Sequence, residues 1–380
     1  MSARSSGVYV HVPHCRRRCP YCDFAIEVGA STDGFVEAVA RELEARAGWL
    51  TWPAQTLSLG GGTPSSLSTT ELARLVDAVR ARGLAEDAEV SLEVNPEDVD
   101  DAYAAGLRAA GFTRVSVGLQ SFDDDVLRYL GRAHDGAGAA AAVRALVNVG
   151  VDVGVDLIVG VPGEGDVRLA EDVARAADLA VVHISTYLLT LEEGTPLVQL
   201  IARGKRAAID DDVQADAYER VRDVCAARGF AQYEVSSHAR GGRASRHNRL
   251  YWQRGDYLGL GPGAHSFRVN DDGAAIRRHT AARLTAWRPD PAQAEADLER
   301  LEPAHALREA VAFGLRDLWA GVDVAALAAL HKTEVPASLR AVLEAAASRG
   351  DVRVDGEAAW LTAKGARFAD RVAREVLGAT

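Results

Sequence analysis

The sequence predicts an α/β protein: an incomplete (β/α)6 barrel, then a small mixed segment, then a helical, winged-helix-like C-terminal domain. Through the first two-thirds of the chain, short β-rich runs alternate with amphipathic helical stretches, which is typical of βα units around a parallel sheet. After about residue 235 the chain becomes rich in Gly, Arg, His and aromatic residues, and a helical tail follows. At 380 residues, two domains or one large barrel with an appendage are expected. The predicted units are residues 1–235, 236–300 and 301–380.

Each βα pair would add one parallel strand to the barrel. The predicted strands are Val8–Val12, Thr56–Leu59, Glu89–Val94, Arg114–Gly118, Val151–Val159 and Val182–Leu189. The helical patterns between them are Asp33–Trp49, Thr69–Arg82, Val99–Ala110, Ala137–Val149 and Val167–Leu179. Six such units favour a curved, incomplete barrel over a closed barrel of eight. A Rossmann sheet is the alternative, but no Gly-x-Gly-x-x-Gly follows the first strand.

The tail contains one hairpin-like stretch among its helices. It runs from Asp351 to Leu361 and turns at Asp355-Gly356, a dipeptide that favours tight hairpin turns. Helices followed by a small hairpin suggest a winged-helix module. Because candidate recognition helices carry few basic residues, we expect a packing or substrate-covering role rather than DNA binding.

Three cysteines close to the start carry the clearest chemistry. Cys15, Cys19 and Cys22 have the spacing Cys-x3-Cys-x2-Cys, and three thiolates can hold three corners of a [4Fe–4S] cluster. The fourth iron would then be open to chelate a small molecule, here the amino and carboxylate groups of S-adenosylmethionine (SAM). Zinc, completed by His11 or His14, is the alternative, but the usual finger and ribbon spacings are absent. A disulfide framework would leave an odd thiol, and Cys225 is expected to be an ordinary small apolar residue.

The charge of the chain limits its partners. The net charge of −11 argues against nucleic-acid binding, although Arg240, Arg243, Arg246, Arg249 and Arg254 crowd one short segment. No secretory signal and no apolar run of membrane-spanning length is visible. An oxygen-sensitive thiolate cluster fits a reducing compartment, so a cytoplasmic location is expected.

Polar residues or glycines follow each predicted strand. They include Gly60-Gly-Gly-Thr63, Glu93-Val-Asn95, Gly118-Leu-Gln120, Asp156 and Tyr187. Parallel α/β folds place ligand sites at the carboxyl ends of their strands, so these residues predict one shared site.

Together these motifs resemble the radical-SAM superfamily, and within it the coproporphyrinogen dehydrogenase-like family in its haem-chaperone branch, HemW. The resemblance covers nearly the whole chain. It includes the Tyr-x-His-x-Pro-x-Cys start, Gly-Gly-Gly-Thr-Pro, Glu-x-Asn-Pro-Glu, Gly-x-Gln-Ser-Phe and Asp-Leu-Ile-x-Gly-x-Pro. It implies that Cys15, Cys19 and Cys22 ligate the cluster. The residues that it places around SAM are Tyr9, Tyr21, Gly61, Gly62, Thr63, Glu93, Gln120, Arg132 and Asp156.

A second motif belongs to the haem-chaperone branch. His-Asn-x-x-Tyr-Trp is present here as His247, Asn248, Tyr251 and Trp252. The resemblance implies haem binding, because an imidazole is a competent axial ligand to haem iron. Arginines close by could pair with the two propionates; they are Arg243, Arg246 and Arg249. Without the resemblance, a structural histidine in an aromatic loop is the better interpretation of His247.

Two departures separate this chain from the dehydrogenase itself. Phe24 stands where that enzyme carries a further cysteine, and only 14 residues precede Cys15. We therefore expect a haem chaperone that binds the cluster, SAM and haem and passes haem to a target protein, with a membrane-associated target left open. The alternative is oxygen-independent decarboxylation of coproporphyrinogen III. A radical-SAM enzyme acting on RNA is a third hypothesis, disfavoured by the acidic charge. No catalytic residue is assigned.

Overall fold

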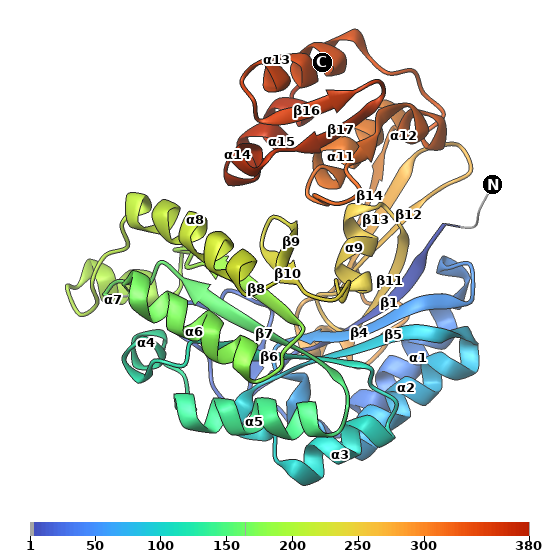
Figure 1. Ribbon diagram of the computed structural model, residues 1–380. Coiled ribbons are helices and arrows are strands. Elements are labelled where there is room, and N and C mark those ends of the chain that lie inside the picture. Colours follow the sequence, from blue (N-terminus) through green and yellow to red (C-terminus); the bar gives the residue numbers. More distant parts are fainter. Residues whose placement is uncertain (1–3, 164, 380) are drawn as a thin grey trace.

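The computed structural model describes residues 4–163 and 165–379 (Figure 1). A twelve-stranded sheet dominates it, with strand order β14-β13-β12-β11-β1-β4-β5-β6-β7-β8-β10-β9. Six central strands run parallel. They are β1 (Ser6–Val12), β4 (Ala54–Gly61), β5 (Leu84–Val94), β6 (Arg114–Gln120), β7 (Asp152–Val159) and β8 (His183–Leu188). The predicted incomplete (β/α)6 barrel is confirmed.

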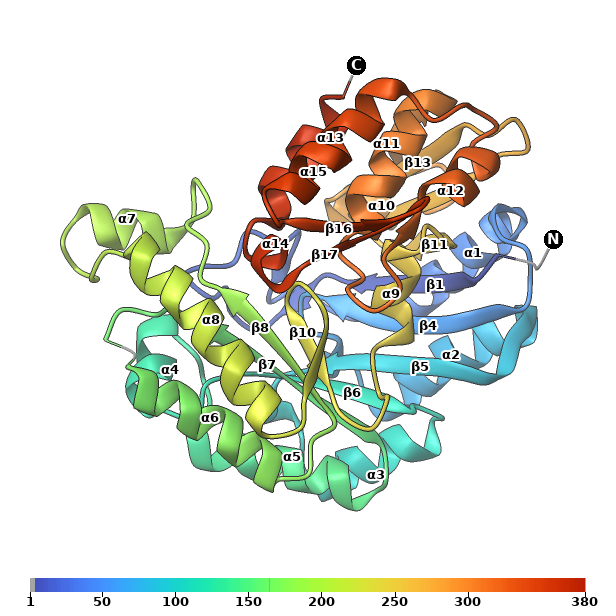
Figure 2. The same ribbon diagram turned by 45° about the horizontal axis from the view of Figure 1, so that its top comes forward.

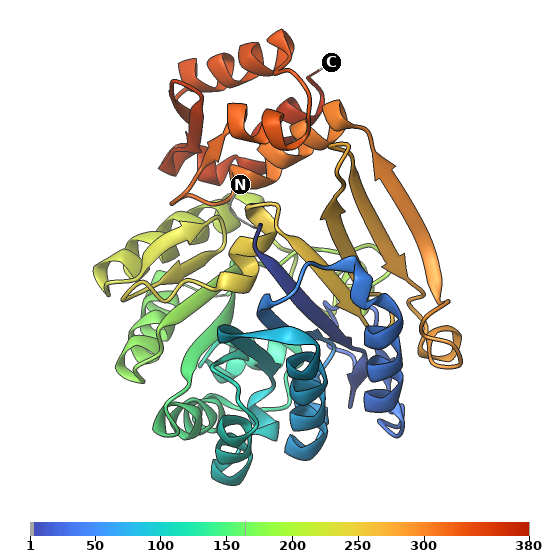
Figure 3. The same ribbon diagram turned by 90° about the vertical axis from the view of Figure 1, so that its right-hand side faces the viewer.

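Helices cover the outer face of the curved sheet (Figures 1 and 3). They are α1 (Phe35–Arg46), α2 (Thr69–Gly83), α3 (Asp101–Ala109), α5 (Gly136–Asn148), α6 (Asp166–Asp178) and α8 (Asp211–Ala227). The start of α2 shows how local sequence fixes where a helix begins, since Ser68 and Glu71 form a reciprocal capping box. Two short helices that the sequence analysis did not assign lie close to the strand ends, α4 (Asp124–Leu130) and α7 (Pro196–Ala202). It did not assign α8 either.

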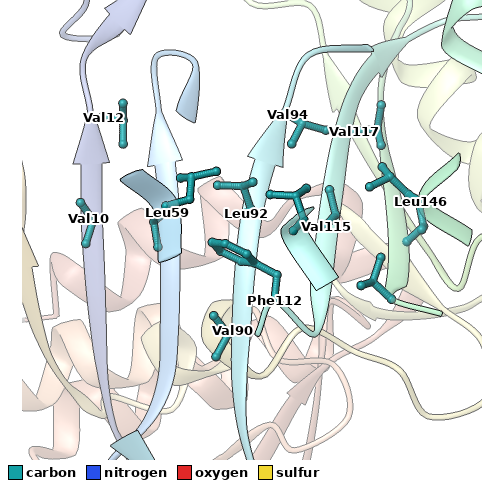
Figure 4. Packing of buried hydrophobic residues seen from close by; sticks show 14 of the residues in the cluster. Val10, Val12, Leu59, Val90, Leu92, Val94, Phe112, Val115, Val117 and Leu146 are labelled. Carbon is teal, nitrogen blue, oxygen red and sulfur yellow. The ribbon is translucent and has the colours of Figure 1, made fainter. Parts of the chain in front are cut away.

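The core lies between the sheet and these outer helices. Alternate residues of neighbouring strands, among them Val10, Leu59, Leu92 and Val115, point to the same side and pack together (Figure 4). Each is at most 1% exposed. Truncating such a leucine to alanine costs about 2–5 kcal/mol, so this layer holds the strand ends, and therefore the site, in place.

Residues 236–300, expected as a linking segment, extend the barrel sheet. The strand β11 (Asp256–Leu260) pairs in parallel with β1, with Gly7 opposite Tyr257. Antiparallel strands continue from it (Figure 3): β12 (His265–Val269), β13 (Ala275–Thr280) and β14 (Glu295–Leu301). On the other edge lie β9 (Ala231–Glu234) and β10 (Ser237–Ala239), while α9 (Arg246–Trp252) and α10 (Leu284–Trp287) complete the segment. The domain boundaries themselves stay a prediction.

The elements of the C-terminal part lie together at one side of the sheet (Figure 2), and they enclose a small core of their own. Its elements follow the order helix, strand, two helices, hairpin, which is the expected winged-helix-like arrangement. They are α11 (Pro303–Gly314), β15 (Val322–Asp323), α12 (Val324–Leu330), α13 (Ala337–Ser348), β16 (Val352–Asp355), β17 (Ala358–Leu361), α14 (Ala363–Arg367) and α15 (Ala369–Leu377). Gly356 turns the β16–β17 hairpin with a φ of +60°. Within the described residues, no helix has both the length and the apolar character needed to cross a membrane.

Candidate iron–sulfur and SAM site

Three cysteines lie on the loop after β1 and line one cavity of about 410 Å3. Cys15 ends the short strand β2 (His14–Cys15), which pairs with β3 (Glu27–Val28). The Cys22 N–H donates to the Cys19 carbonyl at 3.1 Å. All three are free, half-buried thiols, and in the described chain no group of three or more His, Cys, Asp or Glu is placed to hold a single metal ion. Three thiols around one cavity suit a cubane, where each cysteine binds a different iron.

Burial disfavours the thiolate form of two of the three cysteines. Burial raises the pKa of Cys15 and of Cys22. A coordinating metal removes the thiol proton outright, because its charge is the largest in the site. Cluster binding would therefore release protons from this loop.

A chain of hydrogen bonds joins the cysteine loop to the neighbouring strand ends. The Cys15 thiol lies 3.3 Å from the Thr63 hydroxyl. The Asn95 amide donates to that hydroxyl at 3.3 Å. Arg132 donates to the Asn95 oxygen at 2.7 Å and to the Cys19 sulfur at 3.4 Å. The chain thus starts at one cysteine and ends at another, and it holds the loop against β4, β5 and the segment after α4.

Arg132 is therefore largely occupied by protein groups. It also donates to the Gly118 carbonyl at 3.0 Å, while its Nε is buried without a partner. Burial lowers its pKa, but Tyr21, Cys19 and neighbouring Glu97 outweigh burial, so the pKa of Arg132 is raised. The guanidinium remains charged, and its buried Nε is the donor that lacks a hydrogen-bond partner among the described residues.

Two carboxyl groups line the same cavity from β5 and β7. The Gly61 N–H donates to Glu93 Oε2 at 3.2 Å, and the Ser116 hydroxyl donates to Asp156 at 3.0 Å. Burial, with the Asp156 charge beside it, raises the pKa of Glu93 to about 7, and burial also raises the pKa of Asp156. A ligand that brings a positive charge or donates hydroxyl protons would favour the ionised forms of both groups.

The glycines after β4 permit a close approach of two loops. A Cβ on Gly61, whose φ is +107°, would lie 2.6 Å from the His11 ring. A Cβ on Gly62 would lie 2.9 Å from the Pro13 backbone. Larger residues would push the cysteine loop away, so these glycines serve the packing of the loop as well as lining the cavity.

The structure brings most of the predicted SAM residues together. The cavity is lined by Tyr21, Gly61, Gly62, Thr63, Glu93, Gln120, Arg132 and Asp156. Gln120 ends β6 with a φ of +66°, a strained left-handed conformation that clusters at functional sites. Asn95 and Tyr187 also line the cavity; the strand-end pattern predicted both for the shared site, although the resemblance did not place them around SAM.

Tyr9 lies outside this cavity. Its hydroxyl is 3.3 Å from His11 Nδ1, and its ring stacks on His247 with centroids 6.3 Å apart. Burial raises the pKa of Tyr9 above its ordinary range. Its role toward SAM stays a prediction, because the described contacts of Tyr9 are with protein.

The His-Asn-x-x-Tyr-Trp motif forms α9, which packs against the inner face of the sheet. His247 is 2% exposed. Its Nδ1 lies 2.7 Å from the Thr56 hydroxyl and its Nε2 lies 2.7 Å from the Tyr251 hydroxyl. Burial lowers the pKa of His247 to about 3. Iron ligation by His247 stays a prediction, one that requires at least one of these hydrogen bonds to break.

The other members of this motif also contact protein groups. Trp252 stacks on Phe313 of α11 with centroids 6.1 Å apart, and Asn248 lines a small polar cavity of about 110 Å3 inside the barrel. Each arginine expected to meet a propionate already has a carboxylate partner. The pairs are Arg243–Asp152, Arg246–Asp87 and Arg249–Asp317.

Comparison with known proteins adds the following. The family model described as the Radical SAM superfamily matches residues 9–208. The heme chaperone HemW of Mycobacterium tuberculosis is 40% identical over 387 aligned positions, covering 100% of this chain and 96% of that protein. HemW of Escherichia coli K12 is 35% identical, covering 71% of this chain and 72% of its own. The mouse mitochondrial radical S-adenosyl methionine domain-containing protein 1 is 37% identical, covering 82% and 73%.

One solved structure matches nearly the whole fold. Coproporphyrinogen III oxidase (HemN) from Escherichia coli superimposes with a TM-score of 0.83, covering 99% of this chain and 91% of that chain. The two sequences are 22% identical, so this likeness concerns the fold alone.

Proposed function

The chain belongs to the radical SAM superfamily and, within it, to the HemW branch, and we propose on this premise that it is a haem chaperone. It binds a [4Fe–4S] cluster, SAM and haem, and transfers haem to a target protein. The observation that carries the proposal is the set of three thiols around one 410 Å3 cavity, in a chain that matches heme chaperones over its full length.

The cavity residues have separate tasks in this proposal. Cys15, Cys19 and Cys22 hold the cluster, and the hydrogen bonds from Thr63 through Asn95 to Arg132 orient the loop that carries them. When bound, the cluster supplies its open iron to the amino and carboxylate groups of SAM. Glu93 and Asp156 accept hydrogen bonds from the amino or ribose groups, and the strand-end glycines leave room for the methionine part.

We propose little or no decarboxylation of coproporphyrinogen III. Phe24 occupies the place where the resemblance gives the dehydrogenase a further cysteine, and 60% of its surface is exposed. A phenyl ring offers neither a ligand nor a proton donor at this point. The likeness to HemN does not oppose this, because it concerns the fold.

The proposed cellular location follows from the chemistry of the cluster. A thiolate-held cluster persists in a reducing compartment, so we place the protein in the cytoplasm. The haem acceptor is a protein, with membrane association left open, and the net charge of −11 gives no reason to expect nucleic acid.

Anaerobic reconstitution followed by haem loading tests the function. We expect about four iron and four sulfide per chain, a stable haem complex, and transfer of that haem to apomyoglobin used as a general acceptor. A parallel assay supplies coproporphyrinogen III, SAM and dithionite. Repeated turnover there, together with no haem binding, would replace the chaperone by the dehydrogenase.

A further inference from the structure

A histidine that ligates haem iron must offer a reachable, neutral ring nitrogen. Most of the ten histidines in the chain do not. Their rings are buried or hydrogen bonded to protein groups: His11, His14, His134, His183, His238, His247 and His331. Three histidines remain, namely His265, His279 and His305.

Two of these three form a preorganised pair. His265 begins β12 and His279 lies directly opposite it on β13. Their rings stack with centroids 4.2 Å apart and planes 9° from parallel. His265 is exposed and His279 is half-buried, and in residues 4–163 and 165–379 the contact shown for both rings is their mutual stack, with no side-chain hydrogen bond. His305 is exposed on α11 and has no such neighbour.

The pair lies beside the cysteine loop. Gly263, two residues before His265, approaches Ala25 so closely that a Cβ there would lie 3.1 Å from the Ala25 Cβ. The Ala25 carbonyl in turn lies 2.9 Å from His11 Nε2. The residue before Ala25 is Phe24, whose exposed ring could contact a flat apolar ligand.

The surroundings of His265 favour the neutral form of its imidazole ring. Partial burial of its ring lowers the pKa of His265, and its neighbours His279, Arg277 and His11 lower it further. A neutral imidazole retains the lone pair that iron needs.

We propose that His265, in place of His247, is the axial ligand to haem iron and that His279 is a positioning residue stacked on it. This rests on the proposed function of haem carriage. The two axial positions of an iron lie on opposite faces of the porphyrin, so two rings stacked face to face cannot both be ligands of one iron. The more exposed ring, His265, binds iron, and the stack with His279 limits its rotation.

Titration of the full, cluster-loaded chain with ferric haem and with metal-free protoporphyrin IX tests this assignment. His265→Ala should weaken ferric haem binding by about tenfold or more and alter the Soret band. It should leave protoporphyrin IX binding unchanged, because that ligand has no iron. His305→Ala is the matched control, an exposed histidine whose loss should change neither titration.

Variants of His279 test whether its ring positions His265 or binds the haem iron itself. His279→Ala should broaden or shift the haem spectrum, and His279→Phe should restore it, since a phenyl ring can stack but cannot bind iron. If neither variant differs from the parent, His279 has no positioning role.

The possible outcomes distinguish the assignment of His265 from the proposed haem-chaperone function. A parent chain that binds no haem would refute both the haem-chaperone function and the assignment of His265. A parent that binds haem, with His265→Ala matching its affinity and spectrum, overturns the assignment alone. Equal loss of haem and of protoporphyrin IX also overturns it, since the histidine would then support the porphyrin rather than the iron.

Discussion

Arg132 links the ligand cavity to the cysteine loop. Its guanidinium contacts Asn95, the Gly118 carbonyl and the Cys19 sulfur at once. A planar fork with five donors can bridge three acceptors in this way, which the point charge of a lysine cannot do. In the proposed function, Arg132 would therefore affect SAM binding both directly, from the cavity lining, and through the loop that it orients.

Arg132→Ala should weaken SAM binding by about 1.5–3 kcal/mol, because a charged hydrogen-bond donor is lost. Equilibrium binding to the cluster-loaded chain measures this. Arg128→Ala is the control, since Arg128 on α4 is 70% exposed and pairs with Asp125 on the same helix. An Arg132 variant that retains the parental affinity and cluster content would remove this residue from the site.

Glu93 should make the stability of the SAM-free protein depend on pH. Its folded-state pKa of about 7 lies above the ordinary value of about 4.3. The protonated form is therefore favoured by folding, and its contribution is complete below the unfolded pKa and lost as the pH rises through about 7. Glu93→Gln stays neutral, so its unfolding free energy relative to the parent should increase over that interval.

Urea unfolding at a series of pH values checks this dependence. Glu37→Gln provides a control, because a hydrogen bond from Arg74 lowers the pKa of the exposed Glu37, so its pH dependence has the opposite sign and lies below this interval. A constant difference between parent and Glu93→Gln across the interval would contradict the raised pKa.

At the scale of elements, α9 shows how a predicted ligand motif can serve packing. Ser245 caps its N-terminus by accepting from the Asn248 N–H. The Glu89 carboxylate accepts from the N–H groups of Arg246 and His247 and also pairs with Arg114. A carboxylate at a helix N-terminus is favoured by the helix dipole. The helix is thereby attached to β5 and β6 on the inner face of the barrel.

Thr56→Val should lower the unfolding free energy by about 1–3 kcal/mol, because it leaves a buried nitrogen of His247 without its partner. Thr56→Ser keeps the hydroxyl and should cost less. Urea unfolding measures both, and the iron content should be unchanged because the cysteine loop is not involved. Equal stability of Thr56→Val and Thr56→Ser would show that this hydrogen bond contributes nothing.

For the molecule as a whole, the C-terminal part is joined to the barrel through Asp317. Its carboxylate is fully buried and accepts from the side chains of Arg249 and Gln253 at 3.0 Å each. The same group accepts from the N–H groups of Trp319 and Ala320. The Leu318 N–H donates to the Tyr233 carbonyl at 2.8 Å. The Asp317 carboxylate therefore connects α9 with the C-terminal core, and the Leu318 backbone beside it adds the β9–β10 edge.

Asp317→Ala should lower the unfolding free energy by about 1.5–3 kcal/mol, since buried donors lose a charged acceptor. Asp370→Ala, at a carboxylate 89% exposed, should change it by about 0.5 kcal/mol or less. Urea unfolding followed by far-UV circular dichroism measures the stability of both variants. Their iron–sulfur content is a separate measure of whether the barrel site is intact. An Asp317 variant as stable as the parent would mean that apolar contacts such as Trp252–Phe313 suffice to hold the two parts together.

The sequence by itself determined the six parallel strands, the five helices between them, the cysteine loop and the strand-end site, because periodicity and spacing are local properties. Tertiary structure decided that β11 pairs with β1, although some 250 residues separate them. It also decided that His247 is buried with both nitrogens bonded, that the nearby arginines pair with carboxylates, and that His265 stacks on His279. Whether a polar side chain is free or satisfied depends on its neighbours in space, and those neighbours come from distant segments whose pairing no local pattern encodes.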